Sequence, residues 1–91
     1  MAEIKSIEGI IIGDRVQIGD NCNIYQHVTL GQKNGQYPII GNNVTMYPGC
    51  VIIGGITVGD NVVVAPNAVV IQDVPADTIV GGIPAHIIKR L

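Results

Sequence analysis

The sequence predicts an all-β, single-domain solenoid of very short parallel strands, and three observations predict it. An aliphatic residue or Met returns at every sixth position of the central stretch: Ile40, Met46, Ile52, Val58, Val64 and Val70. A second series of small or β-branched residues keeps the same step: Val44, Cys50, Ile56, Val62, Ala68 and Val74. Similar Gly-Asp/Asn-Asn turns also recur along the chain. A period of six is neither that of a helix nor that of an alternating strand. Because one hexad cannot bury its apolar residues alone, the hexads are expected to stack on one another.

Three hexads per coil is the arrangement that explains the turns. Folded in this way, the stretches 18–21, 40–43 and 58–61 form one column of similar corners, whereas a coil of two hexads would scatter them. Glycine and Asn tolerate the left-handed backbone that a sharp corner needs, which gives the recurrence a physical cause. The inward positions hold Ile, Val and Cys, which suit buried parallel strands. The predicted shape is therefore a triangular prism.

Taken in order, residues 1–8 carry no repeat and are expected to form an extension without a definite element. About four triangular coils then fill residues 9–80, with open strand edges near residues 10–12 at the N-terminal end. The step from Leu30 to Ile40 is ten residues rather than six, so the polar stretch 32–38 is predicted to be an extruded loop. Residues 81–84 form a turn, and 85–91, with apolar residues at helical spacing and two terminal cations, predict a short helix or tail that covers the last coil.

Composition narrows the class of protein. The chain has 91 residues, of which 47% are hydrophobic and only 3% aromatic, so the core must be aliphatic and regular. A net charge of −2 without a basic run argues against a nucleic-acid partner. The N-terminal stretch has no apolar run, so we expect neither a membrane segment nor secretion. The expected location is therefore the cytoplasm. Cys22 and Cys50 fall on inward positions and are interpreted as small buried hydrophobes rather than a disulfide or a nucleophile.

The hexads resemble those of the hexapeptide-repeat acyltransferases. The segments IGDNCNIYQHVTLG, PIIGNNV and VAPNAVVIQDVPADTIVGGIPAHII are similar to the C-terminal half of serine O-acetyltransferases and of related polysaccharide-modifying O-acetyltransferases. The resemblance covers roughly residues 9–88. It implies a single-stranded left-handed parallel β-helix, a handedness that periodicity alone does not give, because most parallel crossovers are right-handed.

The resemblance also implies an activity. Members of the family transfer an acetyl group from acetyl-CoA, acting as co-substrate, to a small-molecule hydroxyl or amine, and they form trimers with sites in the grooves between prisms. A His acts as general base, an acidic residue orients it, and main-chain N–H groups bind near the thioester. Imidazole chemistry suits proton removal from an alcohol near neutral pH, and N–H groups can hold a developing oxyanion. A homotrimer, with further stacking through the open N-terminal coil, is expected.

The usual base of serine acetyltransferases is absent from its place. The family's Asp-His-Ala-Thr before the Gly-Ile-Val-Ile-Gly run is Lys5-Ser6-Ile7-Glu8 in this chain, and a second family His before a Pro is replaced by Tyr37. His27 falls in the stack beside Gly49 and Asn67, at a turn where the groove is expected. We therefore take His27 as the candidate base, oriented by Asp20, Asp14 or Glu8. The alternative is a polar corner residue bonded to a neighbouring coil.

The resemblance also indicates where CoA would bind. The positions that match the family's cofactor groove are Tyr47, Pro48 and Gly49 on one coil and Val63, Ala65 and Pro66 on the next. Lys89, Lys33 and Arg90 are the candidate cations for its phosphates, and each is otherwise a solvated surface charge. Pro48 and Pro66 have no N–H to donate. His86 replaces an Arg in the family's Pro-Ala-Arg segment and belongs first to the closing tail, with a direct role at the cofactor as the alternative.

Three functions remain from the sequence. The first is acetyl-CoA-dependent O-acetyl transfer to serine or a sugar hydroxyl. The second is a non-catalytic trimeric scaffold that lacks the usual catalytic His, which Ser6 and Tyr37 favour. The third, a zinc-dependent carbonic anhydrase on the same prism, needs three histidines where this chain has two, and is ranked last.

Overall fold

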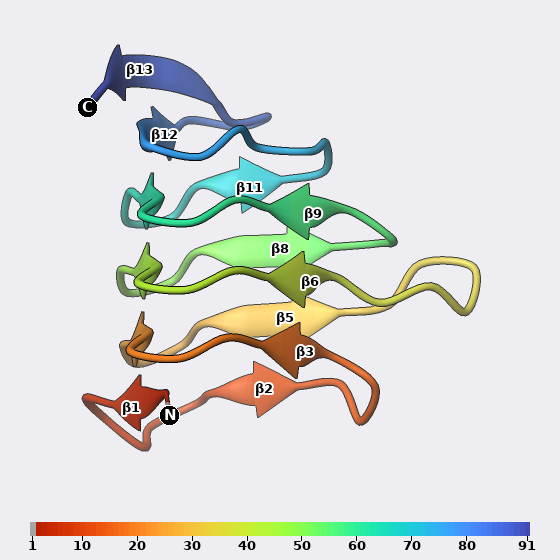
Figure 1. The fold of residues 1–91 in the computed structure, drawn as a ribbon. Coiled ribbons are helices and arrows are strands. Elements are labelled where there is room, and N and C mark those ends of the chain that lie inside the picture. Colours follow the sequence, from red (N-terminus) through yellow and green to blue (C-terminus); the bar gives the residue numbers. More distant parts are fainter. Residues whose placement is uncertain (1) are drawn as a thin grey trace.

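The computed structural model describes residues 2–91 and forms a left-handed parallel β-helix with a triangular cross-section (Figure 1). The chain visits three faces in turn. The first face consists of β1 (Glu3–Ile4), β4 (Asn23–Ile24), β7 (Thr45–Met46), β10 (Val63–Val64), β12 (Thr78–Gly81) and β13 (His86–Arg90). The second consists of β2 (Ile11–Ile12), β5 (Thr29–Gly31), β8 (Val51–Ile53) and β11 (Val69–Val70). The third consists of β3 (Gln17–Ile18), β6 (Ile39–Ile40) and β9 (Thr57–Val58).

The strand register confirms three hexads per coil. Thr45 pairs with Val63 on the first face and Val51 pairs with Val69 on the second, each a step of eighteen residues. Where the extruded loop intervenes, the step is twenty-two, as in the pairing of Gln17 with Ile39. Figure 1 shows residues 32–38 projecting from the prism beyond β5, and an antiparallel bridge between Lys33 and Gln36 closes the loop. The predicted loop is therefore confirmed.

Three columns of corners join the faces. We call them the His27 corner (5–10, 25–28, 47–50 and 65–68), the loop corner (13–16, 32–38 and 54–56) and the Asn21 corner (19–22, 41–44, 59–62 and 75–77). At the Asn21 corner, Asn21, Asn43 and Asn61 all have positive φ, of 60°, 59° and 61°. The N–H of Asn43 donates to the carbonyl of Asp20 (2.9 Å), and that of Asn61 donates to the carbonyl of Asn42 (2.9 Å). These residues therefore stack as the sequence predicted.

Close contact between coils explains one of the corner glycines. A Cβ added at Gly41 would lie 3.0 Å from the amide nitrogen of Asp60 and 3.1 Å from the carbonyl carbon of Gly59. The carboxylate of Asp60 also accepts a hydrogen bond from the N–H of Asn42 (2.8 Å). The turn of the next coil therefore occupies the space that a side chain at position 41 would need.

The core consists of the two predicted hexad series. Ile24, Leu30, Ile40, Met46, Ile52, Val58, Val64 and Val70 are buried, and so are Cys22, Val28, Val44, Cys50, Val62, Ala68 and Val74. The ends of the series differ from its middle, since Ile12 stays 38% exposed on the first coil. Ile56 of the second series is only partly buried. The prism therefore buries two residues in most of its middle hexads, and each coil depends on its neighbours to cover them.

Two expectations about the termini are corrected. The extension over residues 1–8 was expected to lack an element, but Glu3–Ile4 adds β1 to the first face, where the N–H of Lys5 donates to the carbonyl of Ile24 (2.7 Å). The exposed edge of β4 supplies these backbone partners. Met1 lies outside the described residues. The edges of β1, β2 and β3 remain open at this end of the prism, as predicted for residues 10–12.

The helix expected over residues 85–91 does not form. His86–Arg90 is β13, which pairs antiparallel with β12 and covers the last coil as a strand. Seven residues are too few to offset the cost of starting a helix without neighbours to pack on, whereas the edge of β12 offers a row of backbone partners to a segment with two adjacent isoleucines. The expectation of a tail over the last coil is confirmed. No helix among the described residues is long and apolar enough to cross a membrane.

Candidate active site

His27 forms the turn at the His27 corner. Its φ is 60°, and its N–H donates to the carbonyl of Glu8 (2.9 Å). Gly9, Gly49 and Asn67 occupy the same place on the other coils, with φ of 63°, 77° and 60°. This confirms that His27 lies at a turn beside Gly49 and Asn67. A left-handed backbone is uncommon for a residue with a side chain, so the fold tolerates His27 there at some cost in conformational energy.

The imidazole of His27 lies against the backbone of Gly9. A Cβ added at Gly9 would overlap the ring nitrogen Nδ1 and would come within 2.8 Å of Cε1. The side chain is exposed, and it makes no hydrogen bond within residues 2–91. Glycine at position 9 therefore leaves a place for the ring, while both ring nitrogens remain available to an outside group.

The three acidic residues considered as orienting partners lie at three different corners. Glu8 shares the corner with His27 and contacts it through its carbonyl. Asp14 lies at the loop corner, where its hydrogen bond with Tyr37 raises the pKa of the Tyr37 phenol. Asp20 lies at the Asn21 corner, where its N–H donates to the side-chain oxygen of Asn42 (2.8 Å). Glu8 is thus the one of the three that the fold brings to the corner of His27.

A column of side chains runs beside His27 on the first-face side of the same corner. The rings of Tyr25 and Tyr47 stack, with centroids 5.2 Å apart and planes at 30°. In the backbone, the N–H of Tyr25 donates to the carbonyl of Met46 (3.1 Å), and the N–H of Tyr47 donates to the carbonyl of Val64 (3.1 Å). The next coil has Ala65 in this column, so Tyr47 is followed by a methyl group and stays 38% exposed.

The residues predicted to bind CoA gather on two adjoining surfaces. The two coils that follow His27 at the His27 corner hold Tyr47, Pro48 and Gly49, and then Ala65 and Pro66. Val63 lies beside them, with its side chain on the outside of the first face. Lys89 pairs with Ile79, which pairs with Val63. Residues paired in this way point to the same side of a sheet, so Lys89 joins this surface.

The three candidate cations are not equally placed. A register shift between Ile79 and Val80 puts Lys89 opposite Ile79 in β13, and Arg90 pairs with Thr78 further along the same strand. Lys33 lies in the extruded loop at the loop corner. Lys89 and Arg90 therefore lie on the first face, and Lys33 does not.

The expected backbone donors are largely engaged. The N–H of Gly49 donates to the carbonyl of Gln26 (3.1 Å), and the N–H of Ala65 donates to the carbonyl of Val80 (2.9 Å). Pro48 and Pro66 have no N–H. Within one protomer, these residues therefore offer shape and apolar surface rather than amide donors.

The cysteines are buried and free, as predicted. Burial raises the pKa of the Cys50 thiol to about 12, so this thiol stays neutral in the folded protein. The thiol of Cys22 donates to the carbonyl of Gly41 (3.1 Å). A neutral, enclosed thiol is a poor nucleophile, so both residues serve the core.

Two features of the corner were not predicted from the sequence. Gly9 makes room for the ring of His27, and Tyr25 stacks on Tyr47. The signal for Gly9 was present, because it precedes His27 by one coil of eighteen residues. His86, by contrast, lies at the C-terminal end of the prism on β13, away from His27.

Known proteins resemble this chain over nearly all of its length. Residues 37–72 match the family described as "Bacterial transferase hexapeptide (six repeats)". A serine acetyltransferase of Staphylococcus epidermidis is 46% identical over 86 residues, which are 90% of this chain and 40% of that protein.

Solved structures of serine acetyltransferases share the fold. The serine acetyltransferase from Brucella abortus in complex with coenzyme A matches with a TM-score of 0.94 at 31% identity. The match covers 98% of this chain and 37% of the Brucella chain. The serine acetyltransferase from Neisseria gonorrhoeae in complex with serine matches with a TM-score of 0.91 at 30% identity. The match covers 97% of this chain and 37% of the Neisseria chain. The chain thus spans about two fifths of the length of the relatives it matches. Its hexads are similar to those of the bacterial transferase hexapeptide family, and its β-helix resembles that of the serine acetyltransferases.

Proposed function

We propose that the protein transfers an acetyl group from acetyl-CoA to a hydroxyl group of serine or of a sugar, with His27 as the general base. The observation that carries the proposal is the imidazole of His27, which is exposed at a corner, seated over Gly9 and without a hydrogen-bond partner among residues 2–91. A polar corner residue that served only the fold would be expected to bond to a neighbouring coil. The resemblance to serine acetyltransferases supports the assignment of acetyl transfer to this protein.

The reaction needs one proton acceptor and one leaving group. The imidazole of His27 takes the proton of the acceptor hydroxyl as its oxygen attacks the thioester carbonyl carbon. The carbon–sulfur bond then breaks, the sulfur of CoA leaves, and the proton passes to that sulfur. Acetyl ester and free CoA are the products, and no covalent intermediate with the protein is required. Glu8 shares the corner with His27 and its carbonyl accepts the N–H of His27, so we assign it to position the base through the backbone.

CoA is assigned to the surface formed by Tyr47, Val63 and Ala65, with Lys89 beside it. This surface is apolar and lies on the same corner as His27, which suits the pantetheine arm of CoA. Lys89 supplies a positive charge for a phosphate. Pro48, Gly49 and Pro66 shape the adjoining corner.

Calorimetric titration with CoA and with acetyl-CoA tests this assignment. We expect a dissociation constant between about 1 μM and 1 mM, the range of ordinary enzyme substrates. Ala65→Phe places a ring next to Tyr47 on the following coil, and is expected to weaken the binding of CoA at least about tenfold. Ile39→Phe adds the same ring to the third face and is the matched control. A homogeneous protein that gives no heat and no stabilisation at ~1 mM CoA would instead support a non-catalytic scaffold.

We further propose that the protein is a homotrimer whose prisms meet through the second face. The outward residues of that face are apolar or β-branched: Ile11, Thr29, Val51, Ile53, Val69 and Ile71. Ile11 is 62% exposed and Ile71 is 51% exposed in the single chain. A row of this kind marks an interaction surface. Because the second face adjoins the His27 corner, contacts there would place His27 at the border between two protomers.

Sedimentation velocity tests the trimer. The unaltered protein is expected to sediment as a trimer at micromolar concentration, and Val51→Asp, which adds a charge to the centre of the second face, is expected to give monomers. Ile39→Asp makes the equivalent change on the third face and should leave the trimer intact. A monomeric parent protein would remove the proposed groove, and dissociation by Ile39→Asp alone would move the interface to the third face.

A further inference from the structure

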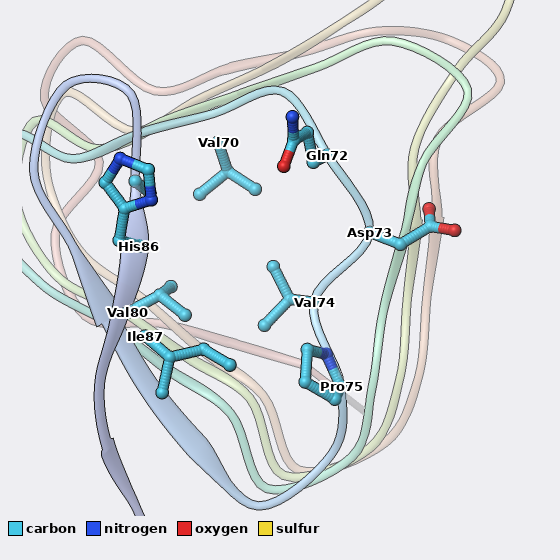
Figure 2. Close-up of a pocket in the computed structure, with 9 residues that line it drawn as sticks. Val70, Gln72, Asp73, Val74, Pro75, Val80, His86 and Ile87 are labelled. Atoms are coloured by element: carbon cyan, nitrogen blue, oxygen red, sulfur yellow. The ribbon is translucent and has the colours of Figure 1, made fainter.

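A cavity lies at the C-terminal end of the prism, apart from the His27 corner. Its volume is ≈ 240 Å³. It lies inside the last coil, between the end of β11, residues 72–75, and the hairpin of β12 and β13 (Figure 2). About half of the wall is apolar, and this half includes Val70, Val74, Val80 and Ile87.

Three polar side chains border this cavity, and two of them face the apolar part of its wall. Figure 2 shows Gln72 and His86 on either side of Val70, across the cavity from Pro75. Within residues 2–91, neither side chain makes a hydrogen bond. Asp73 also belongs to the lining, but its carboxylate points away from the centre and accepts the N–H of Thr57 (2.8 Å). The acidic group nearest the cavity is therefore already engaged on the third face, while an amide and an imidazole remain available.

The available groups match a carboxylate. The amide of Gln72 carries two N–H donors and the imidazole of His86 carries at least one, whereas a carboxylate has two oxygens that only accept. Hydrogen bonds to an ionised acceptor are stronger than those between neutral groups. An alcohol would use fewer of these donors, and a cation would be drawn to the carboxylate of Asp73, which points away from the centre of the cavity. The head group that fits this edge best is therefore an anion with two oxygens.

The apolar wall sets the rest of the ligand. A dry cavity of about 150 Å³ lined by aliphatic side chains is large enough for benzene. The present cavity, at ≈ 240 Å³, is larger, and its valine and isoleucine walls favour an alkyl chain or a single ring. It is below the ~300 Å³ at which pockets for drug-sized ligands begin. We infer that this cavity binds a small apolar monocarboxylate, with the carboxylate at Gln72 and His86 and the alkyl or aryl group against Val74, Val80 and Ile87.

Hexanoate is a suitable probe, observed through the imidazole signals of the full chain by nuclear magnetic resonance. The chain has two histidines, and a His27→Asn variant identifies the signals of His86. Titration with sodium hexanoate, without CoA, is expected to shift the signals of His86 and to leave those of His27 in place. A dissociation constant on the order of 1 mM is expected for a ligand of this size.

Variants on the two sides of the cavity test the assigned contacts. Gln72→Glu replaces the donors with a negative charge, and is expected to weaken hexanoate binding at least about tenfold. Gln72 is exposed, so this change does not disturb the core. Val74→Phe fills the cavity and is expected to abolish the shift of His86, with a thermal melt to verify folding. Gln17→Glu, an exposed position on the third face, is the matched control for added charge.

Two comparison ligands test whether binding needs both the carboxylate and the alkyl chain of hexanoate. Acetate has the same head group without the chain, and hexanol has the chain without the carboxylate; both are expected to bind at least about tenfold more weakly. The inference is overturned if ~10 mM hexanoate leaves His86 unshifted, or if Gln72→Glu binds it as well as the parent protein does. It is equally overturned if His86 is covered by concentration-dependent self-association at this end. None of these outcomes depends on acetyl transfer, so the experiments test the cavity independently of the proposed activity.

Discussion

His27→Asn is expected to lower kcat/KM for acetyl transfer to serine by about 10²- to 10⁴-fold, the range for loss of a general base. Asparagine is the sharper substitution than alanine because position 27 has φ of 60°, a conformation that Asn adopts more readily than other residues with a Cβ. Asn67 already holds the same place two coils away, with the same φ of 60°. The variant therefore removes the imidazole and keeps the turn. Release of CoA from acetyl-CoA in the presence of serine measures the effect.

The control for this variant is a matched change at another corner. Asn43→Gly alters a positive-φ turn of the Asn21 corner, where no residue of the proposed site lies, and should leave kcat/KM unchanged. The free energy of unfolding of His27→Asn should remain within about 0.5 kcal/mol of the parent value. Full activity in His27→Asn would exclude His27 as the base. CoA binding that survived such a result would keep the cofactor surface and require another base.

Most of the prism could be predicted because its signal is local and repeated. Every coil uses the same two inward positions per hexad, so a sequence of hexads specifies burial, register and corner without long-range information. The one break in the period, between Leu30 and Ile40, located the extruded loop for the same reason. Handedness came from the family resemblance, because a periodic pattern is the same for either hand.

The ends of the prism were harder to predict because they do not repeat. The two-residue strand β1 is too short to show a period, and it forms because β4 has an open edge. Residues 86–90 have helical spacing, but the edge of β12 decides their conformation. The step also shortens at the last coil, where Val64 pairs with Val80 after sixteen residues. In each case the neighbouring strand, rather than the local pattern, determines the structure.

The candidate site was predicted in part. The column spacing placed His27 at a corner with Gly49 and Asn67, and the family resemblance brought Tyr47 and Ala65 to the same corner. The seat for the ring at Gly9 depends on a contact between coils, and the cavity beside His86 depends on how the hairpin of β12 and β13 closes the last coil. Contacts of this kind follow from three-dimensional packing, which a period along the chain does not contain.

Ile52→Ala is expected to have the largest effect on stability, because Ile52 is 0% exposed at the centre of the stack, on β8 between β5 and β11. Removing a buried isoleucine side chain down to its Cβ costs about 2–5 kcal/mol, since the lost contacts are joined by a cavity that rigid neighbours cannot close. In a domain of this size, about 3 kcal/mol corresponds to a fall in Tm of more than roughly 10 °C. Ile39→Ala is the matched control, because Ile39 points outward from the third face and is 45% exposed. Thermal unfolding followed by circular dichroism compares the two variants. Equal losses would show that the hexad positions do not divide into inward and outward sets, and the stacked prism on which the His27 corner and the cavity both depend would then be wrong.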